Sequence, residues 1–145
     1  MEKILCLIFV LFLNNIAFGQ TAKDSLLIRE SSLNYIEGFY TNDFKRVEKA
    51  IHPELAKRIV VKDSIDGSML KNMGASELLY NTKKFKKSLK QSSELFKATV
   101  TIFDISKDIA TVKVIQNKMN FFDYLHLAKI NNEWKIINVL WTRTE

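Results

Sequence analysis

The sequence has little cysteine, histidine, glycine or proline, and each shortage excludes a class of protein. Its one cysteine, Cys6, lies near the start, so disulfides cannot support the fold of the remaining chain. Two histidines, His52 and His126, make a poor ligand supply for a metal ion. The 4 glycines are scattered, and neither a phosphate-binding glycine loop nor a Gly-x-Ser-x-Gly nucleophile motif occurs. We therefore expect no metal, no cofactor and no thiol nucleophile.

The N-terminus has the layout of a secretory signal peptide. A charged head is followed by an apolar run over residues 4–13 and then by polar and small residues up to Gln20. The apolar run is shorter than the roughly 20 residues that span a bilayer. We expect cleavage after Gly19, a secreted or periplasmic location, and no stable membrane insertion afterwards. Cys6 lies too early in the run to be a lipidated cysteine and leaves with the peptide.

The rest of the chain reads as a single domain over residues 20–145, following the signal peptide over 1–19. It contains one proline, Pro53, and neither an internal repeat nor a low-complexity linker. A chain of this length is within the usual range of one domain and can bury a core without disulfides.

The formal net charge of +6 allows a nucleic acid or an anionic surface as partner, but for a secreted protein we interpret it as serving solubility. Five lysines cluster in the segment 83–90, which we interpret as a solvated face. A patch for a polyanion or a membrane surface is the alternative. Aromatic residues are not interleaved with these lysines as single-strand nucleic-acid grooves require, so we expect no nucleic-acid partner.

The first half of the domain predicts helices and one hairpin. A helix starting at Asp24 or Ser25 has an apolar face formed by Leu26, Leu33, Ile36 and Tyr40. A second helix follows the cap residue Asp43 and stops before Pro53. Strands are predicted at 58–62 and 68–72 around the turn pair Asp66-Gly67, and a third short helix at 77–81.

The second half predicts a meander of strands at 98–105, 109–117, 119–130 and 134–142. Helices first and a long antiparallel sheet afterwards define an α+β fold, in which the helices cover one face of the sheet.

This layout resembles the nuclear-transport-factor-2-like superfamily, also called SnoaL-like or cystatin-like, and within it the lumazine-binding family of small bacterial proteins. The residues that carry the resemblance are Tyr35 to Gly38, Asp43-Phe44, Ile51-His52-Pro53, Ala110 to Val114, Phe122 to Leu127 and Trp134 to Trp141. The resemblance implies a cone-shaped, curved antiparallel sheet wrapped around N-terminal helices, an internal pocket, and dimers formed through the sheet face. The superfamily includes isomerases, dehydratases and binding modules, so fold does not give function.

Candidate acid–base residues are Asp123, Tyr124, His126, Asp104 and His52. On a regular strand Tyr124 and His126 point to one side and Asp123 to the other, and either face of that strand can be the inner one. By the same alternation, Trp134 and Trp141 are predicted on opposite sides of the last strand.

The leading hypothesis is a non-enzymatic binding module for a small aromatic or apolar molecule, or a homodimer formed through the sheet. Its predicted ligand-binding residues are Tyr35, Tyr40, His52, Tyr124, His126 and Trp141. The alternative is an isomerase or dehydratase that uses His126, Tyr124 or Asp123. That alternative requires a convergent acid–base pair with shifted pKa values in a buried cleft.

Overall fold

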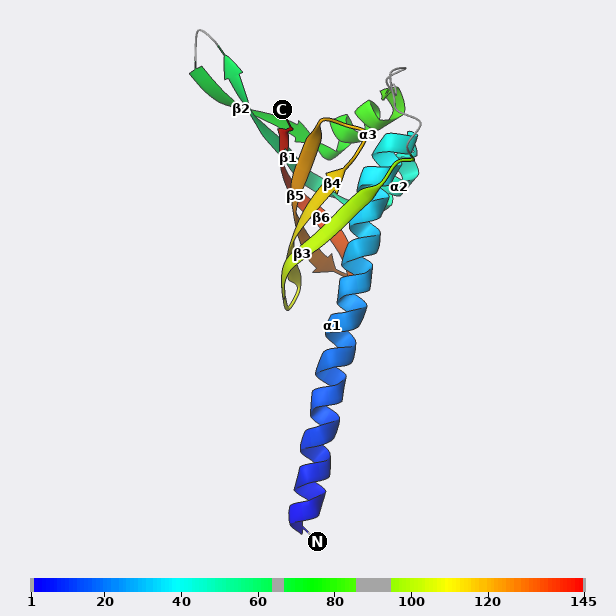
Figure 1. The fold of residues 1–145 in the computed structure, drawn as a ribbon, viewed down its shortest axis with the longest axis vertical. Coiled ribbons are helices and arrows are strands. Elements are labelled where there is room, and N and C mark those ends of the chain that lie inside the picture. The colour runs from blue at the N-terminus through cyan, green and yellow to red at the C-terminus, as the bar shows by residue number, and fades with distance from the viewer. Residues whose placement is uncertain (1, 64–66, 86–94, 145) are drawn as a thin grey trace.

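The computed structural model describes residues 2–63, 67–85 and 95–144, with side chains described from residue 22 onward. The helices are α1 (Glu2–Thr41), α2 (Phe44–Ala50) and α3 (Ala75–Lys84). The strands are β1 (Ile51–Asp63), β2 (Gly67–Gly74), β3 (Ala98–Ser106), β4 (Ile109–Gln116), β5 (Phe121–Ile130) and β6 (Glu133–Arg143). The sheet is curved, α1 runs along it, and α2 and α3 lie together at one end (Figure 1). The predicted α+β cone is confirmed.

Helix α1 begins at Glu2, so the predicted start at Asp24 or Ser25 is wrong. A single glycine inside a helix costs only about 1 kcal/mol, and the segment contains no proline to stop it. Asp24 does not act as a helix cap. Its buried carboxylate accepts hydrogen bonds from Trp134 Nε1 at 3.0 Å and from Lys129 Nζ at 2.9 Å. These bonds fasten α1 to the hairpin between β5 and β6.

The buried face of α1 differs from the predicted one at its first residue. Ile28, Tyr35 and Ile36 are almost fully buried, whereas Leu26 is 70% exposed. Ser31 and Ser32 lie on the buried face, where a bulkier side chain would hold the helix further from its neighbours. Their hydroxyls donate to the carbonyl oxygens of Ala50 at 3.2 Å and Ile28 at 2.8 Å, so these buried polar groups are satisfied.

Gly38 allows α2 to pack closely against the end of α1. A Cβ at this position would lie 2.9 Å from Arg46 Cβ and 3.0 Å from Val47 Cγ2. The Asp43 carboxylate accepts a hydrogen bond from the backbone N–H of Arg46 at 3.2 Å, as predicted for the cap of α2. The two helices therefore form a tight corner that closes one side of the cone.

Helix α3 is fastened to this corner by Asn42, whose φ of 63° places it in the left-handed region. Its side-chain amide donates to the carbonyl oxygens of Thr82 at 2.8 Å and Phe85 at 2.7 Å. The Thr82 carbonyl oxygen also accepts from the Phe85 backbone N–H at 3.3 Å, so Asn42 adds a second hydrogen bond at the C-terminal end of α3. These hydrogen bonds position Leu78 and Asn81 over the wide end of the sheet.

The strand order is β2-β1-β6-β5-β4-β3, and all neighbours are antiparallel except β1 and β6, which are parallel. The strands predicted at 58–62, 68–72, 98–105, 109–117 and 134–142 correspond to β1, β2, β3, β4 and β6. The segment predicted at 119–130 corresponds to β5, and the helix predicted at 77–81 lies within α3. The parallel pair was not predicted, because β1 and β6 are joined by no hairpin and their pairing depends on closure of the whole sheet.

A β-bulge in β6 changes which side chains face the helices. Leu127 pairs with Ile136 and the preceding His126 pairs with Asn138, so Ile137 is an extra residue in β6. The alternation of side chains shifts by one at this point. Trp134 and Trp141 therefore both face α1, and the prediction that they lie on opposite sides is wrong.

Parts of two predicted features lie outside the described residues. Of the turn pair Asp66-Gly67 only Gly67 is described, and of the lysine-rich segment only residues 83–85. Lys83 and Lys84 end α3, where their ammonium groups lie 3.9 Å and 5.8 Å from the ring centres of Phe44 and Tyr80. In the described part of the chain, no helix is both long and apolar enough to cross a membrane.

Candidate functional site

A cavity of about 120 Å³ lies between α1, α3 and the inner face of the sheet. Its lining is almost entirely apolar. The residues that line it are Tyr35, Phe39, Lys57, Met73, Leu78, Asn81, Phe121 and Trp141. A largely apolar cavity with a few polar groups is typical of sites for small organic molecules.

Lys57 is the charged residue of this lining and is only 6% exposed. It lies on β1 between Leu55 and Ile59, which are 3% and 8% exposed, so it occupies an inward position of an alternating strand. A lysine in such a position must find polar partners, because an unpaired buried ammonium is costly.

Two buried side chains hold the Lys57 ammonium. Its Nζ donates to Asp123 Oδ1 at 2.6 Å and to the Tyr35 hydroxyl oxygen at 2.7 Å. Asp123 is fully buried, and its Oδ2 atom has no hydrogen-bond partner among the described residues. Because the Tyr35 oxygen accepts from Lys57, its own proton remains available to Asp123 or to a molecule in the cavity.

The pKa values of this group are shifted by burial. Desolvation raises the pKa of Asp123 above 3.8, although the charge and hydrogen bond of Lys57 and the nearby Tyr35 hydroxyl act in the opposite direction. Desolvation lowers the pKa of Lys57 from 10.5 against the influence of the carboxylate. Burial and the Asp123 charge raise the pKa of Tyr35 well above 10.0, so this hydroxyl stays neutral. The pKa values of acid and amine move towards each other, which makes proton transfer between them easier.

Three aromatic rings surround the Lys57 ammonium on the cavity side. Its Nζ lies 4.9 Å from the ring centre of Trp141, 5.4 Å from that of Tyr35 and 5.5 Å from that of Phe121. Phe121 and Trp141 also pack edge to face, with ring centres 5.5 Å apart. The electron-rich faces of Trp141 and Phe121 can stabilise a cation that has been removed from water, whereas Tyr35 contacts Nζ through its hydroxyl oxygen.

Of the six predicted ligand-binding residues, Tyr35 and Trp141 line this cavity and the other four lie elsewhere. Tyr124 is 38% exposed and His126 is exposed on the outer face of β5, whereas Asp123 is buried on the inner face. The face of β5 that carries Asp123 is thus the inner one, a point that alternation alone left open. Asp104 and His126 line a separate groove of about 280 Å³, and His126 Nδ1 lies 3.2 Å from the side-chain amide of Asn138.

Tyr40 and His52 contact other residues instead. The Tyr40 ring stacks on Phe96, with ring centres 4.2 Å apart and planes 15° from parallel. His52 Nδ1 accepts a hydrogen bond from the backbone N–H of Glu54 at 3.2 Å. Both contacts lie outside the cavity lining.

Lys57 is the residue that sequence reasoning missed. The predicted strand began at Arg58 and therefore left out Lys57, although β1 extends from Ile51 to Asp63. The signal was present in the alternation of Leu55, Lys57 and Ile59, which places a lysine in a row of core residues. Its partner Asp123, one of the candidate acid–base residues, lies on β5, which β6 separates from β1.

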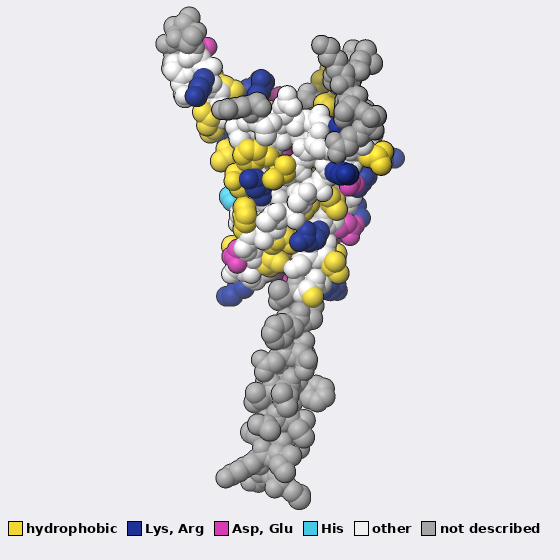
Figure 2. Space-filling model, viewed as in Figure 1, with side chains coloured by type: hydrophobic (Ala, Val, Ile, Leu, Met, Phe, Trp, Pro, Cys, Tyr) yellow, Lys and Arg dark blue, Asp and Glu magenta, His cyan; other side chains and the backbone are white. Residues whose placement is uncertain are grey.

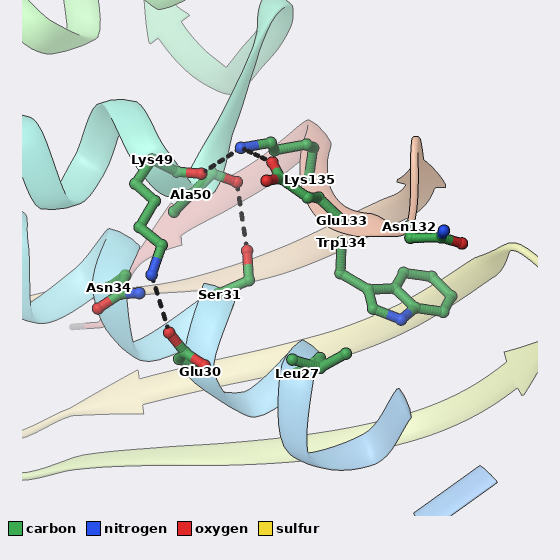
Figure 3. A pocket seen from close by; sticks show the side chains of 10 residues that line it. All are labelled: Leu27, Glu30, Ser31, Asn34, Lys49, Ala50, Asn132, Glu133, Trp134 and Lys135. Atoms are coloured by element: carbon green, nitrogen blue, oxygen red, sulfur yellow. Dashed lines mark hydrogen bonds and ion pairs between the residues drawn. The ribbon is translucent and has the colours of Figure 1, made fainter. Parts of the chain in front are cut away.

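A groove of about 230 Å³ beside residues 27–34 of α1 is larger but chemically different. Figure 3 shows that its four charged side chains are paired, Lys49 with Glu30 and Lys135 with Glu133. Lys49 contacts Glu30 at 3.1 Å, and Lys135 contacts both Glu133 at 2.8 Å and the Lys49 carbonyl oxygen at 2.7 Å. Because these groups already satisfy each other, we take the cavity around Lys57 as the candidate site. Among the described residues, no group of three or more His, Cys, Asp or Glu side chains is placed to hold a metal ion.

The fold and cavity define the chain as a small α+β protein with a nuclear-transport-factor-2-like fold. The family model described as "Putative lumazine-binding" matches residues 23–142, and the chain belongs to this family. No curated protein matches its sequence.

Solved structures support the fold. A nuclear-transport-factor-2-like protein of unknown function from Shewanella baltica has a TM-score of 0.71 at 19% identity, covering 86% of this chain and 96% of that one. A ketosteroid isomerase-like protein from Erwinia carotovora atroseptica has a TM-score of 0.56 at 11% identity, with coverages of 83% and 95%. A "Putative Scytalone Dehydratase" from Novosphingobium aromaticivorans has a TM-score of 0.61 at 9% identity, with coverages of 88% and 89%. At these identities the likeness concerns the fold alone.

Proposed function

We propose that the protein binds a small, flat, largely apolar molecule in the cone cavity, with a hydrogen-bond acceptor directed at Lys57. The observation that carries this proposal is the buried Lys57 ammonium at the edge of a ring-lined cavity. The family description also points to a small-molecule ligand. Phe39, Phe121 and Trp141 supply apolar surface for a ring, while Lys57 and Tyr35 supply hydrogen-bond donors.

Lumazine, a planar double ring with carbonyl acceptors, is the first probe to test. We expect it to change the tryptophan fluorescence, because Trp141 lines the cavity. Lys57→Met should weaken binding by about 10- to 100-fold, since a hydrogen bond from a charged donor is worth about 1.5–3 kcal/mol. Lys135→Met is the matched control, because that lysine contacts the separate groove.

Circular dichroism of each variant separates lost binding from lost fold. A second variant, Trp141→Leu, leaves the ion pair intact and should also weaken binding. Equal affinity of wild type, Lys57→Met and Trp141→Leu for the probe would place the ligand outside this cavity and end the proposal.

A second candidate function is proton transfer on the bound molecule. It is supported by the acid–base pair of Lys57 and Asp123, whose pKa values burial shifts towards each other beside an apolar cavity. An enzyme of this kind would exchange a proton next to a ligand carbonyl for deuterium from heavy water. Exchange at the uncatalysed rate would leave only the binding role.

We also propose that a second copy of the chain covers the outer face of the sheet. Side chains on this face are apolar and exposed by 38% to 57%: Val60, Leu70, Phe103, Tyr124 and Leu140. Val60 pairs with Leu70 and Tyr124 with Leu140, and the Phe103 and Tyr124 ring centres are 6.1 Å apart. Hydrophobic side chains gather over the strands, with lysines between them (Figure 2).

Light scattering after gel filtration tests this dimer. Wild type should elute at twice the monomer mass, and Leu140→Glu should be monomeric because a buried charge without a partner is unfavourable at an interface. Leu26→Glu, a change at an exposed position on α1, is the control and should remain a dimer. A wild-type monomer at micromolar concentration would contradict the proposal.

Export from the cytoplasm remains part of the proposed function. The charged head, short apolar run and small exit residues support cleavage after Gly19. A chain starting at Gln20 would keep Asp24 and therefore its bonds to Trp134 and Lys129. The intact mass of the protein made in an exporting host should correspond to residues 20–145.

A further inference from the structure

We propose that Lys57 forms an imine with the carbonyl carbon of a small ring-bearing aldehyde or ketone held in the cavity. This inference rests on the proposed binding function and adds the chemical class of the ligand. It assigns to Lys57 a covalent role that a charge-pairing lysine would not need.

The geometry places an amine where such a ligand would bind. Among the described residues that line the cavity, Lys57 supplies the only amine. The Trp141, Tyr35 and Phe121 rings lie 4.9 Å to 5.5 Å from its Nζ, so a ring held among them has its substituent near that atom. The cavity of about 120 Å³ is somewhat smaller than one of roughly 150 Å³ that holds a benzene molecule, so it can take one ring of a ligand and no more.

The surroundings also favour the reactive form of the amine. The nucleophile is the neutral amine, and burial of Lys57 disfavours its ammonium form. Asp123 can take the proton at its Oδ2 atom, which has no partner among the described residues. The neutral carboxylic acid is also favoured by burial.

The reaction then balances within this group. The ammonium of Lys57 gives a proton to Asp123, and the neutral Nζ attacks the carbonyl carbon while the π electrons move to oxygen. That oxygen takes the proton from Asp123, and Nζ returns one proton to the carboxylate. The hydroxyl leaves as water with this proton, and the nitrogen lone pair forms the C=N bond. The products are a protonated imine, one water molecule and the Asp123 carboxylate.

The protonated imine would be stabilised where it forms. Asp123 Oδ1, now 2.6 Å from Nζ, becomes its counter-ion. The faces of the Trp141 and Phe121 rings stabilise the remaining cationic charge. The Tyr35 hydroxyl, 2.7 Å from Nζ, can donate its proton to the oxygen of the intermediate.

The test uses benzaldehyde and cyanoborohydride at neutral pH, with intact mass and peptide mapping as readouts. The full domain should gain one reduced adduct at Lys57, formed faster than at other lysines, because burial favours the neutral amine of Lys57. Lys57→Arg keeps the positive charge but has no amine, and should lose this adduct. Lys135→Arg should keep it.

Benzyl alcohol, which has the ring but no carbonyl, keeps the test informative even if Lys57→Arg fails to fold. It should protect Lys57 of the wild-type protein from labelling. Labelling spread over surface lysines with Lys57 unmodified overturns the imine. If benzyl alcohol still changes the tryptophan fluorescence in that case, the binding function stands. If neither benzyl alcohol nor lumazine changes it, the binding function fails as well.

Discussion

Replacing Asp123 by alanine is expected to lower the free energy of unfolding by about 3–5 kcal/mol, because it leaves the buried Lys57 without its counter-charge. Lys57 is 6% exposed, and its remaining partner, the Tyr35 hydroxyl, carries no charge. Loss of that much stability is a large fraction of the 5–15 kcal/mol typical of a domain. Urea denaturation at neutral pH measures the effect.

The loss should shrink as the pH rises. In the variant, Lys57 has a lower pKa when folded than its ordinary 10.5, so the unfolded chain binds more protons in the interval between these values. Stability then rises with pH across that interval. Glu30→Ala is the control, because the Glu30–Lys49 pair is exposed and should contribute less than about 1 kcal/mol. A cost for Asp123→Ala no greater than this control would show that the buried pair does not support the fold.

Replacing the whole polar group by apolar residues is expected to preserve or increase stability while removing ligand binding. In the triple variant Tyr35→Phe, Lys57→Met, Asp123→Leu, no buried polar side chain loses a partner within the group. Buried ion pairs replaced by apolar residues of similar size are often neutral or stabilising by about 1–4 kcal/mol. Lumazine and benzaldehyde, in contrast, should no longer bind or react.

The pH dependence distinguishes the triple variant from wild type. Asp123 has a raised pKa when folded, so its contribution to stability is present below 3.8 and lost as the pH rises through the folded value. Lys57 has a lowered pKa, so its contribution is present above 10.5 and lost as the pH falls through the folded value. Between these limits, burial of the two charges therefore lowers the free energy of unfolding of wild type. The triple variant should have its largest stability advantage in this pH range. A variant that unfolds more easily than Asp123→Ala would contradict this account.

Together these two results would separate what keeps the domain folded from what its cavity does. If the three residues can be replaced together without loss of stability, whereas Asp123 cannot be replaced alone, the group is not needed to keep the domain folded. A role in the chemistry of the cavity would then explain its presence. The cavity around Lys57 would then be a functional site whose polar residues bring a net cost to the fold.

Most of the fold could be predicted from the sequence because its signals are local. The alternation in 109–117 predicts β4. Helix α2 does stop before Pro53, as predicted, but it already ends at Ala50, because Ile51, His52 and Pro53 belong to β1. Asp43 caps α2 as its position indicated. The resemblance to the family extended these local predictions to the cone.

The candidate site was harder to predict because its residues are far apart in the sequence. Tyr35 lies on α1, Lys57 on β1 and Asp123 on β5, and the parallel pairing of β1 with β6 decides that they meet. The bulge at Ile137, which has no local sequence signal, brings Trp141 to the same face. Tyr124 and His126 have side chains suited to acid–base chemistry. Because Asp123 points to the inner face of β5, strand alternation places both of them on the outer face.

By itself, the sequence determined the type and order of most elements, since helix caps, turns and alternation depend on neighbours within a few residues, and its resemblance determined the family. Only the tertiary structure decided which face of β5 is buried and which charges meet inside. Burial of Lys57 and Asp123 depends on how six strands and three helices close around them, and burial is what shifts their pKa values. The pKa shifts of Lys57 and Asp123 are therefore a property of the assembled fold and not of any one segment.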